Sequence, residues 1–325
     1  MHNQSKNSHS SLSGTQKDDR VFTENVPRPF VKYPKGSSEG RIEIHRKKPD
    51  QAPLVSIIIP TADATRDGLL PSLLKQLEEQ TFRDFEIIVI IGDTRQGRAI
   101  NCGAQLAEGK YLVTFDDDTR LGHNDLLEKM VSQIEKHPDI GMAGVANLVP
   151  DDASFFVRRV MKELPRRTSP MVTEIVDSDM AEHPCCIIPR HVFLEVGGEN
   201  EIIPRGLDPY LRQEIRKAGY RVVVLPGVYI HHLPPKTFKK FVKQFYRNGK
   251  MAAYVNKFYP EFVIELTTRH GDEVPKKRFI ISRIFSYFYR LLATLVTFRI
   301  FYLLSLILYL SGYIVGYLNL NKDDV

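Results

Sequence analysis

Short, wholly apolar runs alternate along this chain with segments whose apolar residues recur at helical spacing. The apolar runs have the length of strands and cover residues 54–59, 86–91, 111–115 and 141–148. The segments with helical spacing lie between them, at residues 69–80, 99–107 and 126–134. Strands that are apolar throughout indicate a sheet covered on both faces, so the pattern predicts an open α/β sheet with helices on either side. Ligands of such sheets bind beyond the carboxyl ends of the strands.

The longest apolar stretch lies near the C-terminus. Only uncharged residues stand between Arg299 and Lys322, and at about 1.5 Å per helical residue they span about 33 Å, enough for a bilayer core. We therefore expect a membrane-spanning helix over residues 299–321. The alternative is a hairpin of two spans. It ranks second because no Gly, Pro or Asn marks a turn near Arg299.

Basic residues precede that stretch and predict an interfacial helical region over residues 261–298. They are Lys276, Lys277, Arg278, Arg283 and Arg290. Because Lys and Arg favour cytoplasmic flanks, we expect a single-pass protein of the cell membrane with its large N-terminal part in the cytoplasm and its tail outside.

The N-terminal 53 residues are expected to be a disordered tail and a linker. The first 20 residues are polar and have no apolar core, which excludes a signal peptide. Residues 21–53 mix Pro, Gly and charge, with one strand candidate at residues 41–45. The globular domain should then cover residues 54–260.

Composition adds two constraints. Of 325 residues, 45 are Lys or Arg and 39 are Asp or Glu, and the net charge of +6 suits an anionic membrane surface or a phosphate-bearing ligand. Cys102, Cys185 and Cys186 match neither a metal-ligand spacing nor a disulfide framework, which indicates a reducing, cytoplasmic compartment.

Three consecutive acids, Asp116, Asp117 and Asp118, follow the apolar run at residues 111–115. They stand where a buried strand would meet solvent at the ligand-binding edge of the sheet. Clustered carboxylates repel one another unless a cation holds them, so the placement predicts a divalent metal. The alternative is a turn or helix N-cap, for which Asp is also suited.

Ten short motifs occur in an order that resembles family 2 glycosyltransferases. They are VSIIIPT at 55–61, QTF at 80–82, FEIIV at 85–89, RAINCG at 98–103, AEGKYL at 107–112, FDDDT at 115–119, VGG at 196–198, GLD at 206–208, KAGYR at 217–221 and VYIHH at 228–232. The resemblance covers about residues 54–254. It implies a GT-A fold with an open mixed sheet, a nucleotide-sugar donor, a divalent metal and inversion at the anomeric carbon.

The resemblance assigns roles to particular residues. Asp116 and Asp118 would hold Mg²⁺ or Mn²⁺, with His231 preferred over His232 as the third ligand. Asp208 would be the general base. The alternative is that it caps the helix expected at residues 209–218, and one residue can do both. Residues placed near the donor are Thr61, Asp93, Arg98, Asn101, Asp117 and Arg247. For Asn101, a helix cap is the alternative.

Departures from the family pattern bear on whether one sugar or a polymer is made. Leu207 stands where the family has an acid, and Asn248 replaces the Trp of the Q-x-x-R-W motif of processive synthases. The chain has no Trp, and therefore lacks that stacking platform. These features favour transfer of a single sugar, from a nucleotide sugar to a lipid-linked or glycan acceptor at the cytoplasmic membrane face, with no nucleic-acid partner. A polyprenyl-phosphate glycosyltransferase and a catalytically silent nucleotide-binding scaffold are the alternatives.

Overall fold

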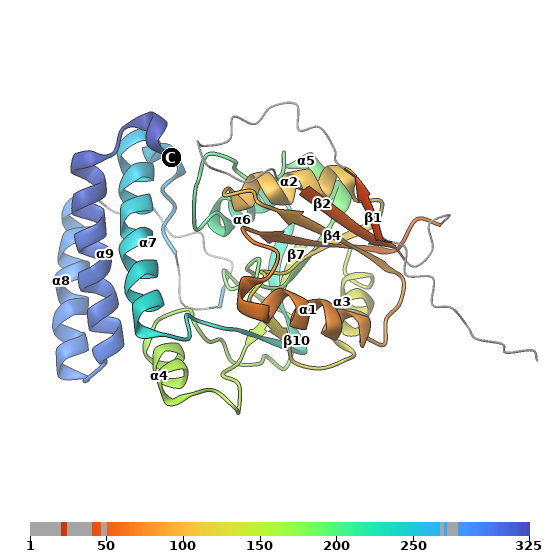
Figure 1. Ribbon diagram of the computed structural model, residues 1–325, viewed down its shortest axis with the longest axis horizontal. Helices are drawn as coiled ribbons and strands as arrows, with labels where there is room; N and C mark the ends of the chain where they lie inside the picture. Colours follow the sequence, from red (N-terminus) through yellow and green to blue (C-terminus); the bar gives the residue numbers. More distant parts are fainter. Residues whose placement is uncertain (1–20, 25–40, 47–50, 267–269, 272–278) are drawn as a thin grey trace, which may run out of the picture.

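The computed structural model describes residues 21–24, 41–46, 51–266, 270–271 and 279–325 (Figure 1). The tail expected to be disordered, residues 1–20, lies outside the described residues. So do Lys276, Lys277 and Arg278.

A mixed sheet forms the centre of the described residues, with strand order β1-β2-β4-β3-β5-β9-β7-β10-β6 and β8 paired to β10. The strands are β1 Val21–Glu24, β2 Arg41–Arg46, β3 Val55–Thr61, β4 Phe85–Ile91, β5 Tyr111–Thr114, β6 Thr119–Leu121, β7 Ile140–Asn147, β8 Val176–Asp177, β9 Cys186–Pro189 and β10 Arg221–His232. β3 pairs in parallel with β4 and β5, and β7 pairs in parallel with β10. The remaining pairs are antiparallel. The predicted open mixed sheet is confirmed.

Helices cover both faces of this sheet (Figure 1). They are α1 Leu69–Glu78, α2 Gln96–Leu106, α3 Leu126–Ile134, α5 Arg190–Glu195 and α6 Asp208–Lys217, with a 3₁₀ turn, η1, at Arg66–Gly68. α4 Phe155–Glu163 packs instead against the long helices that follow the sheet. α1 and α3 share a buried apolar cluster with one face, and α2, α5 and α6 share another with the opposite face. Because β3 and β4 are buried on both faces, their sequences are mostly apolar and do not alternate with polar residues. We call the sheet with α1 to α6 the sheet domain.

Two segments differ from the sequence-based expectation. β2, within the expected linker, pairs with β4 and buries Ile42 and Ile44 in the core. Pro226 and Gly227, residue types typical of a turn, do not interrupt β10, which continues through both to His232. Its register with β7 shifts between Val224 and Tyr229. A strand irregularity of this kind accommodates Pro and a Gly at φ +69° without ending the strand.

Three long helices follow the sheet domain: α7 Phe238–Phe258, α8 Ile280–Val296 and α9 Ile300–Asn319, with 3₁₀ turns η2 Pro260–Phe262 and η3 Lys322–Asp324. They lie side by side, with α7 next to the sheet domain and α8 on the outer side (Figure 1). Among the described helices, α9 alone is long and apolar enough to cross a membrane, with a mean hydropathy of 1.8. α8 and α9 meet in a tight turn that needs no Gly, Pro or Asn, because Phe298 adopts a φ of 53°.

Glycines allow α7 and α9 to approach one another at backbone distance. A Cβ on Gly249 of α7 would lie 1.9 Å from the Tyr309 carbonyl oxygen, and one on Gly312 of α9 would lie 2.0 Å from the Tyr246 carbonyl oxygen. Such distances are far inside van der Waals contact. The two helices therefore depend on hydrogen-only side chains at this crossing.

We expect Gly312→Ala to lower the free energy of unfolding by about 1–3 kcal/mol, because the helices must move apart. Alanine is otherwise the better helix former by about 1 kcal/mol, so a loss identifies the packing as its cause. The measurement is the urea midpoint in mild detergent. Ser311→Ala, at the exposed neighbouring position, is the control and should stay within about 0.5 kcal/mol of the parent. A Gly312→Ala protein as stable as the parent would contradict the close packing.

Candidate active site

The acidic triplet lies at the carboxyl end of β5, where the chain leaves the sheet. Asp116, Asp117 and Asp118 connect β5 to β6, and β6 pairs antiparallel with the end of β10. In that register His232 stands opposite Thr119, the residue after the triplet. The sheet therefore brings a histidine from more than one hundred positions along the chain next to the acids.

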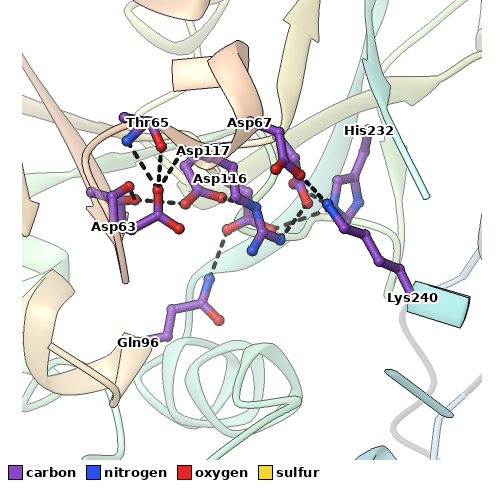
Figure 2. A network of polar contacts seen from close by, with 11 residues as sticks. Asp63, Thr65, Asp67, Gln96, Asp116, Asp117, His232 and Lys240 are labelled. Atoms are coloured by element: carbon purple, nitrogen blue, oxygen red, sulfur yellow. Dashed lines mark hydrogen bonds and ion pairs between the residues drawn. The ribbon is translucent and has the colours of Figure 1, made fainter. Parts of the chain in front are cut away.

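His232 lies beside the acidic triplet (Figure 2). Its Nε2 atom is 3.1 Å from Asp118 Oδ1 and 3.6 Å from Asp116 Oδ2. One ligand atom from each of the three residues lies within 4.8 Å of the other two. Two carboxylate oxygens and one imidazole nitrogen make a donor set that fits a divalent cation such as Mn²⁺. The structure thus brings together Asp116 and Asp118, as the sequence predicted.

His232, and not the preferred His231, is the histidine that lies beside the acids. The His231 ring is hydrogen-bonded through Nδ1 to the Leu148 carbonyl, at 2.8 Å, and not to the acids. Successive side chains on a strand point to opposite faces, so only one of the two histidines can face the triplet. The register of β10 against β6 selects His232.

Polar groups from three other segments hold the triplet in place (Figure 2). The Gln96 amide donates to Asp116 Oδ1 at 2.7 Å, and the Thr61 hydroxyl donates to Asp117 Oδ2 at 2.7 Å. The Arg66 guanidinium lies 3.1 Å from Asp117 Oδ1 and 2.9 Å from Asp118 Oδ2. Thr61 was expected at the site, whereas Gln96 and Arg66 were missed because neither belongs to a recognisable motif.

Burial and the repulsion between like charges give the three acids different pKa values. Burial raises the pKa of Asp116 to about 7 and the pKa of Asp117 to about 6, and the neighbouring Asp118 charge adds to each shift. Burial acts on Asp118 too, but His232 and Arg66 outweigh it and hold the pKa of Asp118 well below its usual range. In return, the carboxylates raise the pKa of His232 against the effect of burial. The triplet therefore needs cations to be fully ionised near neutrality.

Arg66 belongs to a loop that also reaches α7. Arg66 and the following Asp67 have positive φ angles of 44° and 55°, a conformation that costs non-glycine residues energy. Asp67 is ion-paired with Lys240 of α7 (Figure 2). Asp63 anchors the start of the loop by accepting hydrogen bonds from the backbone of Thr65 and Arg66. The loop thus connects the acids with the long helices.

Asp208, the expected base, begins α6 but does not cap it. Its Oδ1 atom accepts the backbone N–H of His183 at 2.8 Å, and Leu207 occupies the N-cap position. The Asp208 charge contributes to the raised pKa of Asp116, so the two carboxylates are neighbours. Burial opposes ionisation of Asp208, but His183 and Arg212 outweigh it and lower the pKa of Asp208.

His183, which the sequence analysis missed, donates its backbone N–H to Asp208. Its Nε2 lies 2.5 Å from Glu199 Oε1, and both side chains are almost completely buried. Burial lowers the pKa of His183, but the Glu199 charge more than compensates and leaves it well above the usual value. No motif marks this pair, since His183 and Glu199 come from separate loops around β9.

Four further residues expected near the donor are Asp93, Arg98, Asn101 and Arg247. Asp93 and Arg98 form a two-bonded ion pair with each other, at 2.8 and 2.6 Å. Asn101, inside α2, binds the Glu199 backbone through both its amide nitrogen and its oxygen, and is therefore no helix cap. Arg247 lies on α7, close enough to Arg205 for its positive charge to lower the pKa of Arg205.

Arg167 and Arg205 lie close enough to the acids to interact with their charges. The pKa of Arg205 is lowered to about 10, first by burial and then by the charges of Arg247 and Arg167, while Asp116 and Asp118 act in the opposite direction. Arg167 likewise feels the charges of Asp118 and Asp116. Positive groups that repel one another beside a cation site provide an environment for a multiply charged anion.

Comparison with known proteins agrees with this geometry. A family model described as glycosyl transferase family 2 matches residues 91–197, which include β5 and the acidic triplet. The similarity is to glycosyltransferases. An uncharacterised glycosyltransferase of Haemophilus influenzae is 25% identical over 185 residues, covering 48% of this chain and 60% of the relative. The chain thus spans about three fifths of that relative's length.

The solved structure of the mannosyltransferase PcManGT from Pyrobaculum calidifontis, in complex with GDP-Man and Mn²⁺, has a similar fold. The TM-score is 0.53 at 12% identity, and the likeness covers 84% of this chain and 89% of PcManGT. This likeness in fold confirms the predicted GT-A type of sheet.

We expect His232→Ala to weaken Mn²⁺ binding at least tenfold, equivalent to about 1.4 kcal/mol, because one of three ligands is lost. Isothermal titration of the purified protein with MnCl₂ measures this. His231→Ala is the matched control and should bind Mn²⁺ as the parent does. The assignment would be refuted if the His231 variant were the weaker of the two.

Mn²⁺ affinity should rise between about pH 6 and about pH 8. Below the raised pKa of Asp116, at about 7, the ion must displace a proton from that carboxyl, and protonated His232 adds to the competition. Above it Asp116 is already deprotonated, and the affinity should rise less steeply. Titrations in buffers of different ionisation heat would also show proton release at the lower pH. Affinity independent of pH would contradict the raised pKa values.

Proposed function

We propose that this protein is a metal-dependent, inverting glycosyltransferase that moves one sugar from a nucleotide-sugar donor to a lipid-linked or glycan acceptor at the cytoplasmic face of a membrane. One observation carries the proposal: Asp116, Asp118 and His232 form a donor set suited to a cation, and Asp208 lies close enough to Asp116 for its charge to raise the pKa of Asp116. The GT-A type of fold supports it. The similar mannosyltransferase was solved with GDP-Man and Mn²⁺, which supports a nucleotide sugar and a divalent ion here.

The chemistry follows from where the charges lie. Asp208 would accept the proton of the acceptor hydroxyl, whose oxygen bonds to the anomeric carbon as the bond to the diphosphate oxygen breaks. The electron pair of that bond leaves with the nucleoside diphosphate. A divalent ion at Asp116, Asp118 and His232 would supply positive charge to this leaving group. Arg167, Arg205 and Arg247 add further positive charge beside it.

Asp208 is suited to act as the general base because its environment keeps its carboxylate ionised. His183 and Arg212 lower its pKa against burial, and the His183 backbone N–H donates to one of its oxygens. The absence of an acid at residue 207 does not leave Asp208 without support, since these groups supply it. This favours an active enzyme over the silent scaffold.

The membrane location rests on the apolar C-terminal helix α9. The reducing compartment suggested by the free cysteines agrees with a cytoplasmic site. The single crossing expected from sequence stays a prediction. Among acceptors, a polyprenyl phosphate is the alternative to a glycosylated lipid, and the basic side chains of α7 would serve its phosphate.

We expect Asp208→Asn to reduce transfer by about 10²–10⁴-fold and to leave Mn²⁺-dependent nucleotide binding within about twofold, because only the proton acceptor is removed. Transfer from radiolabelled UDP- and GDP-sugars to polyprenyl-phosphate and glycolipid acceptors is the assay, with nucleotide binding measured in parallel. Asp139→Asn, an exposed acid at the opposite end of the sheet, is the control.

The outcomes separate the candidate functions. Undiminished transfer by Asp208→Asn would remove Asp208 as the base. Nucleotide binding without any transfer by the parent protein would favour the scaffold. Transfer only to the unglycosylated phosphate lipid would favour the polyprenyl-phosphate enzyme.

A further inference from the structure

α8 exposes apolar residues and packs polar groups against its neighbour. Its apolar residues Ile281, Phe285, Phe288, Leu292 and Leu295 recur at spacings of four and three, so they share one face, and each is more than half exposed. The side turned toward α9 carries polar groups: Thr294 is 3% exposed, and the Tyr287 hydroxyl donates to the Leu306 carbonyl. An apolar stripe along a whole helix, with polar groups on the packed side, indicates an apolar medium outside.

α9 is attached to the sheet domain at its beginning. The Glu163 carboxylate, at the end of α4, accepts the backbone N–H groups of Phe301 at 2.7 Å and Tyr302 at 3.4 Å. These are free donors of the first turn of α9, and a carboxylate there also meets the positive end of the helix dipole. Arg159 holds the same carboxylate, and Arg299 donates to the Glu163 carbonyl.

α9 is attached at its other end as well. The Lys257 ammonium, on α7, donates to the carbonyls of Tyr317 and Leu320, both at 2.9 Å. The Tyr254 hydroxyl donates to the Lys322 carbonyl at 2.9 Å. Leu320 is only 4% exposed and belongs to the apolar cluster of α2, α5 and α6. The tail thus packs into the core of the sheet domain.

A helix held at both ends by one polar domain cannot carry one end across about 30 Å of hydrocarbon. Crossing would break the tail contacts or draw α7 along, and α7 bears Lys239, Lys240, Lys243, Lys250 and Lys257. Each charge at the bilayer centre costs about 2.5–3.5 kcal/mol or more. Lying along the surface keeps every contact and immerses only the outer face.

We infer that α8 and α9 form a membrane-binding hairpin that lies in the plane of one leaflet and does not cross it, with the α8 stripe immersed in lipid. The tail then stays on the same side as Asp208. The partner is an anionic lipid surface, because Arg290 is exposed on α8 and the basic residues 276–278 precede it in the sequence. The inference rests on the proposed membrane location, and not on the chemistry of the site.

The absence of tryptophan makes depth measurable. Phe288→Trp in the middle of α8, Phe298→Trp at the turn and Tyr317→Trp near the end of α9 each introduce one probe. In vesicles of phosphatidylcholine and phosphatidylglycerol, lipids brominated at shallow and deep acyl positions should report similar, shallow depths for all three. Leu194→Trp, exposed on α5, is the control and should not be quenched. A Phe288 probe at the bilayer centre with a shallow Phe298 probe would show a crossing hairpin and overturn the inference.

Sidedness tests the single crossing. In a Cys102→Ser background, where Cys185 and Cys186 are buried, Asp323→Cys marks the tail and Glu135→Cys marks the sheet domain. An impermeant maleimide should label both from the same side of sealed membrane vesicles. Labelling from opposite sides would establish a single span and overturn the inference.

Vesicle flotation separates failure of this inference from failure of the membrane location itself. Phe285→Glu with Phe288→Glu should reduce vesicle binding at least tenfold while Mn²⁺ binding is retained, and Leu194→Glu, the matched control, should float like the parent. A parent protein that does not bind vesicles and dimerises through α8 would overturn both membrane statements. Transfer assayed in detergent would still test the enzyme independently.

Discussion

The site depends on holding three like-charged carboxylates together at the end of a buried strand. Asp116, Asp117 and Asp118 cannot all ionise there without compensation, and the structure supplies it from separate parts of the chain: His232 from β10 and Arg66 from the loop before α1. A bound cation and an anionic donor would extend the same balance of charge. The arginines beside the triplet are explained by that balance, since on their own they repel one another.

α7 links this charge balance to the outer helices. On one side Lys240 pairs with Asp67, next to the arginine that holds the acids. On the other side α7 packs against α9 through Gly249 and Gly312. A membrane-bound hairpin would therefore set the position of the site relative to the lipid surface through a single rigid helix. For an acceptor with a lipid anchor, that placement would bring the reacting hydroxyl to the enzyme without a long search in solution.

Local pattern predicted well wherever burial is uniform along an element. The wholly apolar runs became β3, β4, β5 and β7, because a strand covered on both faces has no polar alternation to obscure it. The acids at the end of β5 were identified for the same reason, since a strand end is visible in sequence. Where burial is uneven the local pattern is less informative, as at Pro226 and Gly227, which an irregularity absorbs within β10 because pairing with β7 resumes beyond them.

By itself the sequence determined the apolar strands, the acidic triplet, the ordered motifs and a C-terminal helix apolar enough for lipid. The tertiary structure decided which of two adjacent histidines meets the acids, that Arg66 and His183 belong to the site, and that α9 is fastened at both ends. The physical reason is that these outcomes are set by register and by contacts between distant segments. A strand shows its composition in sequence, but its partners only once the sheet has formed.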